Sequence, residues 1–356
     1  MSGAGGLLVV GCPEPRLGTA ERRLLVRLQP GGVILFARNL RGFDQLAALV
    51  AAIREAAPRT LLCLDAEGGR VDRLRPLAGP APAAEALARL PVRWSARAGR
   101  TMGELLRACG FDLDFAPVAD LDRGERANAL DGRYFGTTPR AITARAGAFQ
   151  AGLASRGIGG CLKHFPGLGG ARADTHTEGA PIGLPLGALA RDLAPFRRLA
   201  PVSLTMMTAH AAYPARDPSG LPATLSRPIA TALLRRELGF RGLLFSDDLE
   251  MGALAPWGTL ADRAAAALAA GCDGLLLCSE LGAAPGVSRR LSRASLRSRR
   301  EQAERRWERL RGALAALTAN SPPALSREAA VRRREAFAAA VMAAQNGMSS
   351  SSPPAP

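Results

Sequence analysis

Side chains that can bind a ligand or move a proton gather in one short stretch of the chain. Lys163 is the single lysine among 47 basic residues, and it is followed directly by His164. A third group, His176, lies shortly downstream, so this stretch holds two of the three histidines of the protein. Drift can leave one lysine behind, but a lone lysine beside a histidine favours a functional role.

Asp174 and His176 stand two residues apart in the glycine-rich loop that follows. A carboxylate at this spacing can accept a hydrogen bond from the imidazole, which orients the ring and raises its basicity. A mobile loop can carry such a pair over a substrate as an acid/base. The alternative is a local turn with a histidine on the surface.

Carboxylates follow two other apolar runs. Asp247 and Asp248 come directly after residues 243–246, and an ionised Asp there suits a nucleophile or a group that stabilises a cation. Asp65 follows residues 60–64 and precedes a glycine pair and Arg73. Asp and Arg so placed can bind sugar hydroxyls through paired hydrogen bonds, or can form an ion-paired turn. Arg133, in a glycine-bounded turn, either faces a ligand or is solvated.

These residues all lie in a repeating order of elements. The order predicts eight strands, at 7–10, 33–36, 60–64, 113–115, 160–163, 204–208, 243–245 and 274–278. It predicts helices between and after them, at 21–28, 43–56, 94–109, 140–156, 186–199, 228–238 and 260–270. The strands are continuously apolar, which is typical of a parallel sheet that is covered on both faces.

Eight such units favour an α/β fold of the (β/α)8 TIM-barrel type over a doubly wound sheet. In a barrel the carboxyl ends of all strands converge on one mouth, so polar residues far apart in sequence meet there. Besides the residues named above, the strand ends carry Arg38, Asn39, Asp120 and His210.

We expect a single catalytic domain over residues 1–318, with the barrel closed near residue 280. Residues 319–356 predict an Ala-rich helical segment, docked loosely, and a disordered Ser/Pro tail.

The amino-acid composition limits the classes of binding partner that we expect. The net charge of +16 is concentrated late, at 288–311, where interleaved Glu predicts a solvated helix face. Only 4% of the residues are aromatic and no RNA-binding or zinc-finger motif occurs, so we expect no specific nucleic acid, while weak polyanion binding stays open. We also expect a monomer.

The chain offers no signature of a metal, a nucleotide or a membrane. The six cysteines form no CxxC pair, and Walker, Rossmann, GxSxG and HExxH motifs do not occur. No apolar run approaches the roughly 20 residues of a membrane span, and no basic segment precedes the first apolar run. We therefore expect no cofactor, no metal, no membrane and a cytoplasmic location.

Taken in order, the motifs resemble glycoside hydrolase family 3, and within it the bacterial single-domain β-N-acetylhexosaminidases of cell-wall recycling. The resemblance covers about residues 5–280. It rests on GVILFARNL at 32–40, LDAEGGRVDRL at 64–74, GFDLDFAPVADL at 110–121, GRYFG at 132–136, KHFPGLG at 163–169, DTH at 174–176, PATLS at 222–226 and FSDDLEMGAL at 245–254.

The resemblance implies a TIM barrel that hydrolyses glycosides with retention, through a covalent glycosyl-enzyme. By position, Asp247 matches the nucleophile, and His176 with its partner Asp174 matches an acid/base that replaces the usual second carboxylate. Five residues match those that hold the terminal N-acetylglucosamine: Asp65, Arg73, Arg133, Lys163 and His164. The implied activity is exo-release of N-acetylglucosamine from muropeptides with a 1,6-anhydro-muramoyl aglycone, or from chito-oligosaccharides.

Two positions depart from the family pattern, because Leu168 stands where the family usually has His, and Gly170 where it usually has Asp. We also expect the chain to lack the second α/β domain that many family members carry. Three other functions stay open: a β-glucosidase or β-xylosidase of the same family, an N-acetylglucosaminide phosphorylase, and a sugar or polyanion binder without catalysis.

Overall fold

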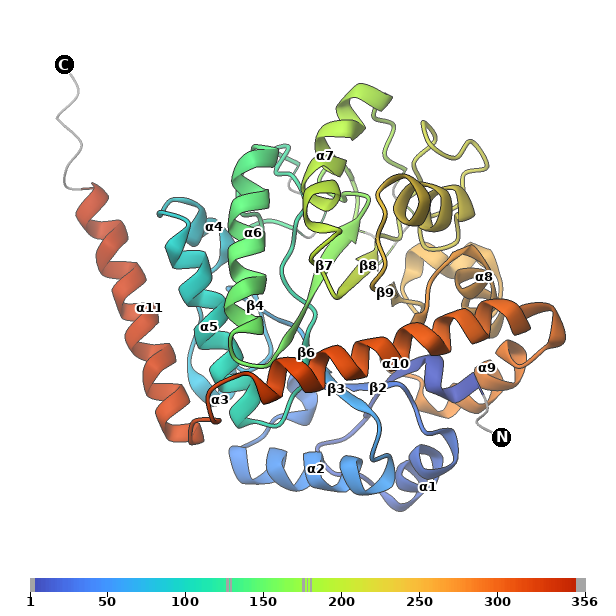
Figure 1. Cartoon of the computed structure of the whole chain (residues 1–356), viewed down its shortest axis with the longest axis horizontal. Coiled ribbons are helices and arrows are strands. Elements are labelled where there is room, and N and C mark those ends of the chain that lie inside the picture. The colour runs from blue at the N-terminus through green and yellow to red at the C-terminus, as the bar shows by residue number, and fades with distance from the viewer. Residues whose placement is uncertain are drawn as a thin grey trace.

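The computed structural model describes residues 4–125, 128, 130–174, 177, 179 and 181–349. Eight parallel strands close into a barrel (Figure 1). Around the barrel they run in chain order, and β10 pairs with β1 to close it. The strands are β1 (Leu8–Gly11), β2 (Gly32–Ile34), β3 (Leu61–Leu64), β6 (Leu113–Asp114), β7 (Gly159–Phe165), β8 (Thr205–Thr208), β9 (Leu243–Asp248) and β10 (Gly274–Leu277). The predicted TIM barrel is confirmed.

Helices surround the barrel because the segments between strands present one apolar face each. In α2 (Phe43–Ala56), the buried residues Leu46, Leu49 and Ile53 recur at helical spacing and pack on the sheet. The other long elements of the ring are α1 (Thr19–Leu28), α5 (Arg93–Ala108), α6 (Pro139–Ala154), α7 (Leu186–Leu199), the π-helix η3 (Pro228–Glu237), α8 (Leu260–Ala270) and α9 (Ala284–Leu291).

A short antiparallel hairpin that the sequence patterns did not predict follows β3. It consists of β4 (Ala66–Gly68) and β5 (Val71–Asp72), and it lies outside the barrel sheet. Its turn needs glycine, since Gly68 and Gly69 have φ of 94° and 60°. A Cβ on Gly68 would also stand 2.3 Å from the carbonyl oxygen of Pro82. The chain then passes through α3 (Arg75–Ala78) and α4 (Ala84–Ala88) to α5.

Helix α10 (Arg297–Ala319) crosses the amino-terminal end of the barrel (Figure 1). Its Trp307 is buried and donates from Nε1 to the carbonyl oxygen of Asp273, 2.9 Å away, at the start of β10. Arg299 and Arg306 of α10 also reach the buried Asp273 carboxylate, at 3.5 and 2.7 Å. The predicted solvated face is therefore partly engaged in ion pairs with the barrel.

The last described helix, α11 (Arg327–Ser349), runs alongside α5 (Figure 1). It buries Ala330, Arg334, Phe337 and Val341, which recur at helical spacing and form its docked face. The Ala-rich composition predicted loose docking, and that expectation is wrong because these four side chains are enclosed. The predicted Ser/Pro tail, residues 350–356, lies outside the described residues.

Among the described residues, no helix combines the length and the apolar character that crossing a membrane requires.

Candidate active site

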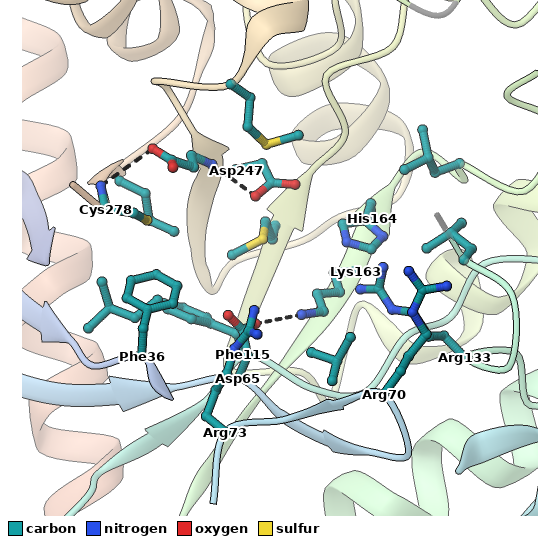
Figure 2. A pocket seen from close by; sticks show the side chains of 18 of the residues that line it. Phe36, Asp65, Arg70, Arg73, Phe115, Arg133, Lys163, His164, Asp247 and Cys278 are labelled. Carbon is teal, nitrogen blue, oxygen red and sulfur yellow. Dashed lines mark hydrogen bonds and ion pairs between the residues drawn. The ribbon is translucent and has the colours of Figure 1, made fainter. Parts of the chain in front are cut away.

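The carboxyl ends of the strands surround a pocket of about 420 Å³ (Figure 2). A volume of this order suits a small ligand that is largely enclosed. Every predicted site residue that the structure describes lines it, while His176 lies outside the described residues. The predicted residues in the lining are Asp65, Arg73, Arg133, Lys163, His164, Asp174 and Asp247.

Lys163 projects into the pocket from β7, whose seven residues are all buried. Its ammonium group lies 2.8 Å from Asp65 Oδ1 and 2.7 Å from Glu67 Oε1. Burial alone would lower the pKa of Lys163, but these two carboxylates outweigh it and raise the pKa above its ordinary value. The single lysine of the protein is therefore a buried, charged donor in the pocket.

Glu67 joins Lys163 to Arg133. The Arg133 guanidinium binds Glu67 in a bidentate pair, with Nε 2.8 Å from Oε2 and Nη2 2.7 Å from Oε1. Burial would raise the pKa of Glu67, yet Arg133 and Lys163 hold it far below its ordinary value. Of the two alternatives for Arg133, the solvated one is excluded, because only 8% of the residue is exposed.

Glu67 is a member of this ion-pair cluster that the sequence reasoning missed. The signal for it was present, because Glu67 follows Asp65 by two residues, and side chains two apart share one face of an extended chain. Asp114 supports the same segment, since its Oδ1 accepts a hydrogen bond from the Ala66 N–H at 2.9 Å. Burial raises the pKa of Asp114 well above its ordinary value.

His164 is oriented by Asp120, which is fully buried. Its Nδ1 lies 2.7 Å from Asp120 Oδ2, and Asp120 also accepts the N–H groups of His164, at 3.2 Å, and Leu168, at 2.7 Å. A carboxylate at Nδ1 favours the proton on that nitrogen and sets the ring orientation. The peptide bond between Lys163 and His164 is cis. Asp120 was predicted only as a polar strand end, and the structure makes it the partner of His164.

Asp247 is the penultimate residue of β9 and faces the pocket beside His164 (Figure 2). Its Oδ1 accepts the N–H of Asp248 at 2.8 Å. Although burial alone would raise the pKa of Asp247, His210 and His164 together with that N–H hold it below its ordinary value. His210 is itself held by Thr224 Oγ1 and by the carbonyl oxygen of Asp248, at 2.7 and 2.8 Å. Asp247 is thus an ionised carboxylate at a strand end.

Asp248 turns toward β10, where its Oδ1 accepts the N–H groups of Glu250 and Cys278 at 3.1 and 3.4 Å. Burial, helped by the charges of Glu250 and Asp247, raises the pKa of Asp248 from 3.8 to about 7. At pH values between 3.8 and about 7, Asp248 is protonated in the folded chain and ionised in the unfolded chain. This contribution to stability is therefore fully present below the lower pKa and is lost as the pH rises through about 7.

Asp248→Asn should remove this pH dependence while keeping the accepting oxygen. We expect the free energy of unfolding, measured with urea at about pH 5 and about pH 7.5, to fall less with rising pH in Asp248→Asn than in the wild type. Glu301→Gln, at a half-exposed residue that pairs with Arg297, serves as the control and should follow the wild type. Equal falls in wild type and Asp248→Asn would contradict the assignment.

Apolar packing accommodates both residues that depart from the family pattern, Leu168 and Gly170. Leu168 is 4% exposed and lines the pocket, while its N–H is bound by Asp120. A Cβ on Gly170 would stand 3.0 Å from Leu184 Cδ1, so an apolar contact occupies the space beside this glycine. The hydrogen bond that orients His164 is present with Leu168 in place.

The other predicted strand-end residues divide into two groups. The Arg38 and Arg73 guanidinium groups lie 4.6 and 5.7 Å from the centre of the Phe36 ring, and all three residues line the pocket. Asn39 is outside the lining, because its amide donates to the carbonyl oxygens of Cys12 and Glu14 at 3.0 and 2.9 Å. Asn39 thus supports the loop and not the pocket.

Within the described part of the chain, no group of three or more His, Cys, Asp or Glu side chains is placed to hold a metal ion. The six cysteines are buried free thiols.

Comparisons with known proteins agree with this geometry. Residues 5–304 match the model of the glycosyl hydrolase family 3 N-terminal domain. A β-hexosaminidase of Alkalilimnicola ehrlichii is 44% identical over 301 residues, which covers 80% of this chain and 84% of that protein.

Two solved structures are similar over most of the chain. A family 3 β-N-acetylglucosaminidase of a Paenibacillus species superposes with a TM-score of 0.83 at 28% identity, covering 94% of this chain and 68% of that one. The NagZ of Neisseria gonorrhoeae, in complex with N-trifluoroacetyl-D-glucosamine, gives a TM-score of 0.72 at 32% identity and covers 88% and 98%. The chain therefore belongs to glycosyl hydrolase family 3, as an enzyme of the β-hexosaminidase type.

Proposed function

We propose that the protein is a retaining exo-β-N-acetylglucosaminidase that releases terminal N-acetylglucosamine from peptidoglycan-derived muropeptides. The observation that carries this proposal is that the Asp247 carboxylate faces one pocket together with the buried Lys163, His164 and Arg133. The similarity to β-hexosaminidases over most of the chain supports the choice of an N-acetylated sugar.

In the first step, Asp247 attacks the anomeric carbon as the bond to the leaving-group oxygen breaks. The transition state carries positive charge on the sugar ring, which the Asp247 carboxylate stabilises before the covalent bond forms. His176 gives a proton to the departing oxygen, and Asp174 orients its ring. In the second step, His176 takes a proton from water, which attacks the anomeric carbon and frees Asp247.

The remaining residues of the pocket bind the sugar. Lys163 and Arg133 offer N–H donors to hydroxyl oxygens, and Asp65 offers an acceptor. Their charges are already paired in the structure, so binding the sugar requires little reorganisation of these groups. His164, held by Asp120, adds a ring nitrogen of set orientation.

A muropeptide aglycone carries carboxylates, and the pocket lining fits such a group. Arg38, Arg70 and Arg73 line the pocket together with Phe36. Arginine is well suited to carboxylate recognition because its planar guanidinium binds two oxygens at once. The buried free thiols are compatible with a reducing compartment, and we propose action in the cytoplasm.

Hydrolysis of two chromogenic substrates tests the proposed activity. We expect the protein to release nitrophenol from nitrophenyl N-acetyl-β-glucosaminide at least about 100-fold faster than from nitrophenyl β-glucoside, because an enclosed acetamide adds binding that the glucoside lacks. The reverse preference would favour the β-glucosidase alternative. Repeating the assay with inorganic phosphate separates hydrolysis, which yields N-acetylglucosamine, from phosphorolysis, which yields its 1-phosphate.

A further inference from the structure

A buried ion pair joins the C-terminal helix α11 to the hairpin strand β5. The side chains of Arg334 and Asp72 are 2% and 0% exposed, and Arg334 Nη2 binds Asp72 Oδ2. Arg334 also donates to the carbonyl oxygen of Gly79, from Nη2 at 2.6 Å and from Nε at 3.1 Å. Asp72 Oδ2 accepts the Ala81 N–H at 3.1 Å. One guanidinium thus ties α11 both to the hairpin and to the segment that follows it.

Asp72 lies next to the segment that carries the sugar-binding carboxylates, with its side chain on the face away from the pocket. In the hairpin it pairs with Ala66, which stands between Asp65 and Glu67. The Arg73 N–H donates to the Asp65 carbonyl oxygen at 3.3 Å, which links the two arms again. Asp72 itself stands between Val71 and Arg73, which both line the pocket. Because side chains alternate along a strand, Asp72 points away from the pocket toward α11.

A second observation places Arg334 near the site. Arg334 and Glu67 line the same small cavity of about 10 Å³, which Phe337 of α11 and Met102 of α5 also border. Glu67 is the carboxylate that pairs with both Lys163 and Arg133. The docked face of α11 and the charged cluster of the pocket therefore meet at this cavity.

Arg334 is the cation that compensates the buried Asp72 carboxylate. A carboxylate that is fully enclosed and loses its cationic partner must take up a proton, admit water or move, because an unpaired buried charge is strongly unfavourable. Each of these responses shifts the hairpin, and displacements of about 1 Å at a binding site reduce activity greatly. The helix that supplies Arg334 lies beyond residues 5–304, the part that matches the family model.

We propose that Arg334 is a positioning residue of the active site, which holds the β4–β5 hairpin so that Asp65 and Glu67 meet Lys163 and Arg133 in the sugar-binding arrangement. Docking of α11 thereby sets the affinity of the pocket for the terminal sugar. This inference rests on the proposed function, because its readout is binding and turnover of an N-acetylglucosaminide.

The test is Arg334→Met in the full-length chain, because methionine keeps much of the side-chain volume without the charge. At a temperature where the variant is folded, we expect kcat/KM for the nitrophenyl N-acetylglucosaminide to fall about tenfold, mainly through KM. The dissociation constant of N-acetylglucosamine, measured by calorimetry, should rise by about the same factor. The matched control is Arg333→Met, because Arg333 is the adjacent arginine on α11, is half exposed and pairs with Glu104 at 2.7 Å. It should leave KM within about twofold of the wild type.

Removing both charges of the Arg334–Asp72 pair should rescue the KM. The double variant Arg334→Met, Asp72→Asn leaves no buried charge unpaired, so its KM should return most of the way to the wild-type value. Arg334→Lys keeps the charge but loses the fork of donors, and its KM should be intermediate. If Arg334→Met does not fold, the double variant and Arg334→Lys carry the test by the same measurements.

A folded Arg334→Met with a lower melting temperature but wild-type KM and sugar affinity would overturn the proposal, since Arg334 would then serve stability alone. A wild-type KM in Arg334→Lys would overturn it where Arg334→Met is unfolded. Absence of turnover in the wild type would instead sink the proposed function. The calorimetric comparison of sugar binding would still decide the role of Arg334.

Discussion

Asp247→Asn is expected to lower kcat by at least about 1,000-fold while N-acetylglucosamine still binds with an affinity near that of the wild type. The amide has the size of the carboxylate but cannot form the glycosyl ester or balance the positive charge of the transition state. The measurement is the steady-state rate with the nitrophenyl N-acetylglucosaminide, together with calorimetry of the free sugar. The neighbouring Asp248→Asn, which turns toward β10, should keep at least about a tenth of kcat.

Azide distinguishes the nucleophile from a residue that merely supports it. In Asp247→Ala, an azide ion can occupy the space of the missing carboxylate and attack the anomeric carbon from the same face. The expected product is therefore the α-glycosyl azide, with the rate partly restored. Wild-type turnover in Asp247→Asn, or a β-azide from Asp247→Ala, would refute the assignment of Asp247.

Glu67→Gln is expected to produce the second large effect, on both stability and binding. The substitution keeps the shape of the side chain but leaves the buried Lys163 and Arg133 cations without the carboxylate between them. We expect the free energy of unfolding to fall by about 3 kcal/mol, since breaking a buried pair on one side leaves an uncompensated charge. We expect kcat/KM to fall at least about 100-fold, because both cations that grip the sugar change position.

Glu85→Gln is the matched control for this prediction. Glu85 pairs with Arg89 at 2.9 Å, but the two side chains are 53% and 69% exposed. Removing this surface pair should change the free energy of unfolding by less than about 0.5 kcal/mol and leave the kinetics unchanged. Urea unfolding and steady-state kinetics measure both effects. A Glu67→Gln variant with the stability and KM of the Glu85→Gln control would show that Glu67 does not organise the site.

The barrel could be predicted from the sequence because each βα unit carries its own local pattern. The helices α2, α7 and α8 begin and end at the predicted residues. The strand bounds differ by a few residues at most, because continuous apolar runs mark a buried strand wherever they occur. Once the parallel barrel is established, its topology brings the carboxyl ends of the strands together. This is why Asp65, Lys163 and Asp247, far apart in sequence, could be predicted to share one pocket.

The role of His176 stays a prediction, because this residue lies outside the described part of the chain. The assignment of Asp174 as its partner stays a prediction with it, although Asp174 lines the pocket.

Which groups touch inside the pocket was decided by the tertiary structure. Strands β4 and β5 are too short to leave an alternating pattern, so the hairpin could not be derived, and the spacing of Asp65 and Glu67 alone did not show that Glu67 lies between Lys163 and Arg133. Asp120 was visible only as a polar strand end, since its contact with His164 spans 44 residues of sequence. Arg334 was one arginine among many in an Ala-rich segment, and only the docking of α11 makes it buried. The sequence by itself determined the barrel and most of the strand-end side chains that reach its mouth, because periodicity and strand order are local properties. The ion pairs that organise the site depend on distances between segments that are remote in the chain, and these distances exist only in the folded molecule.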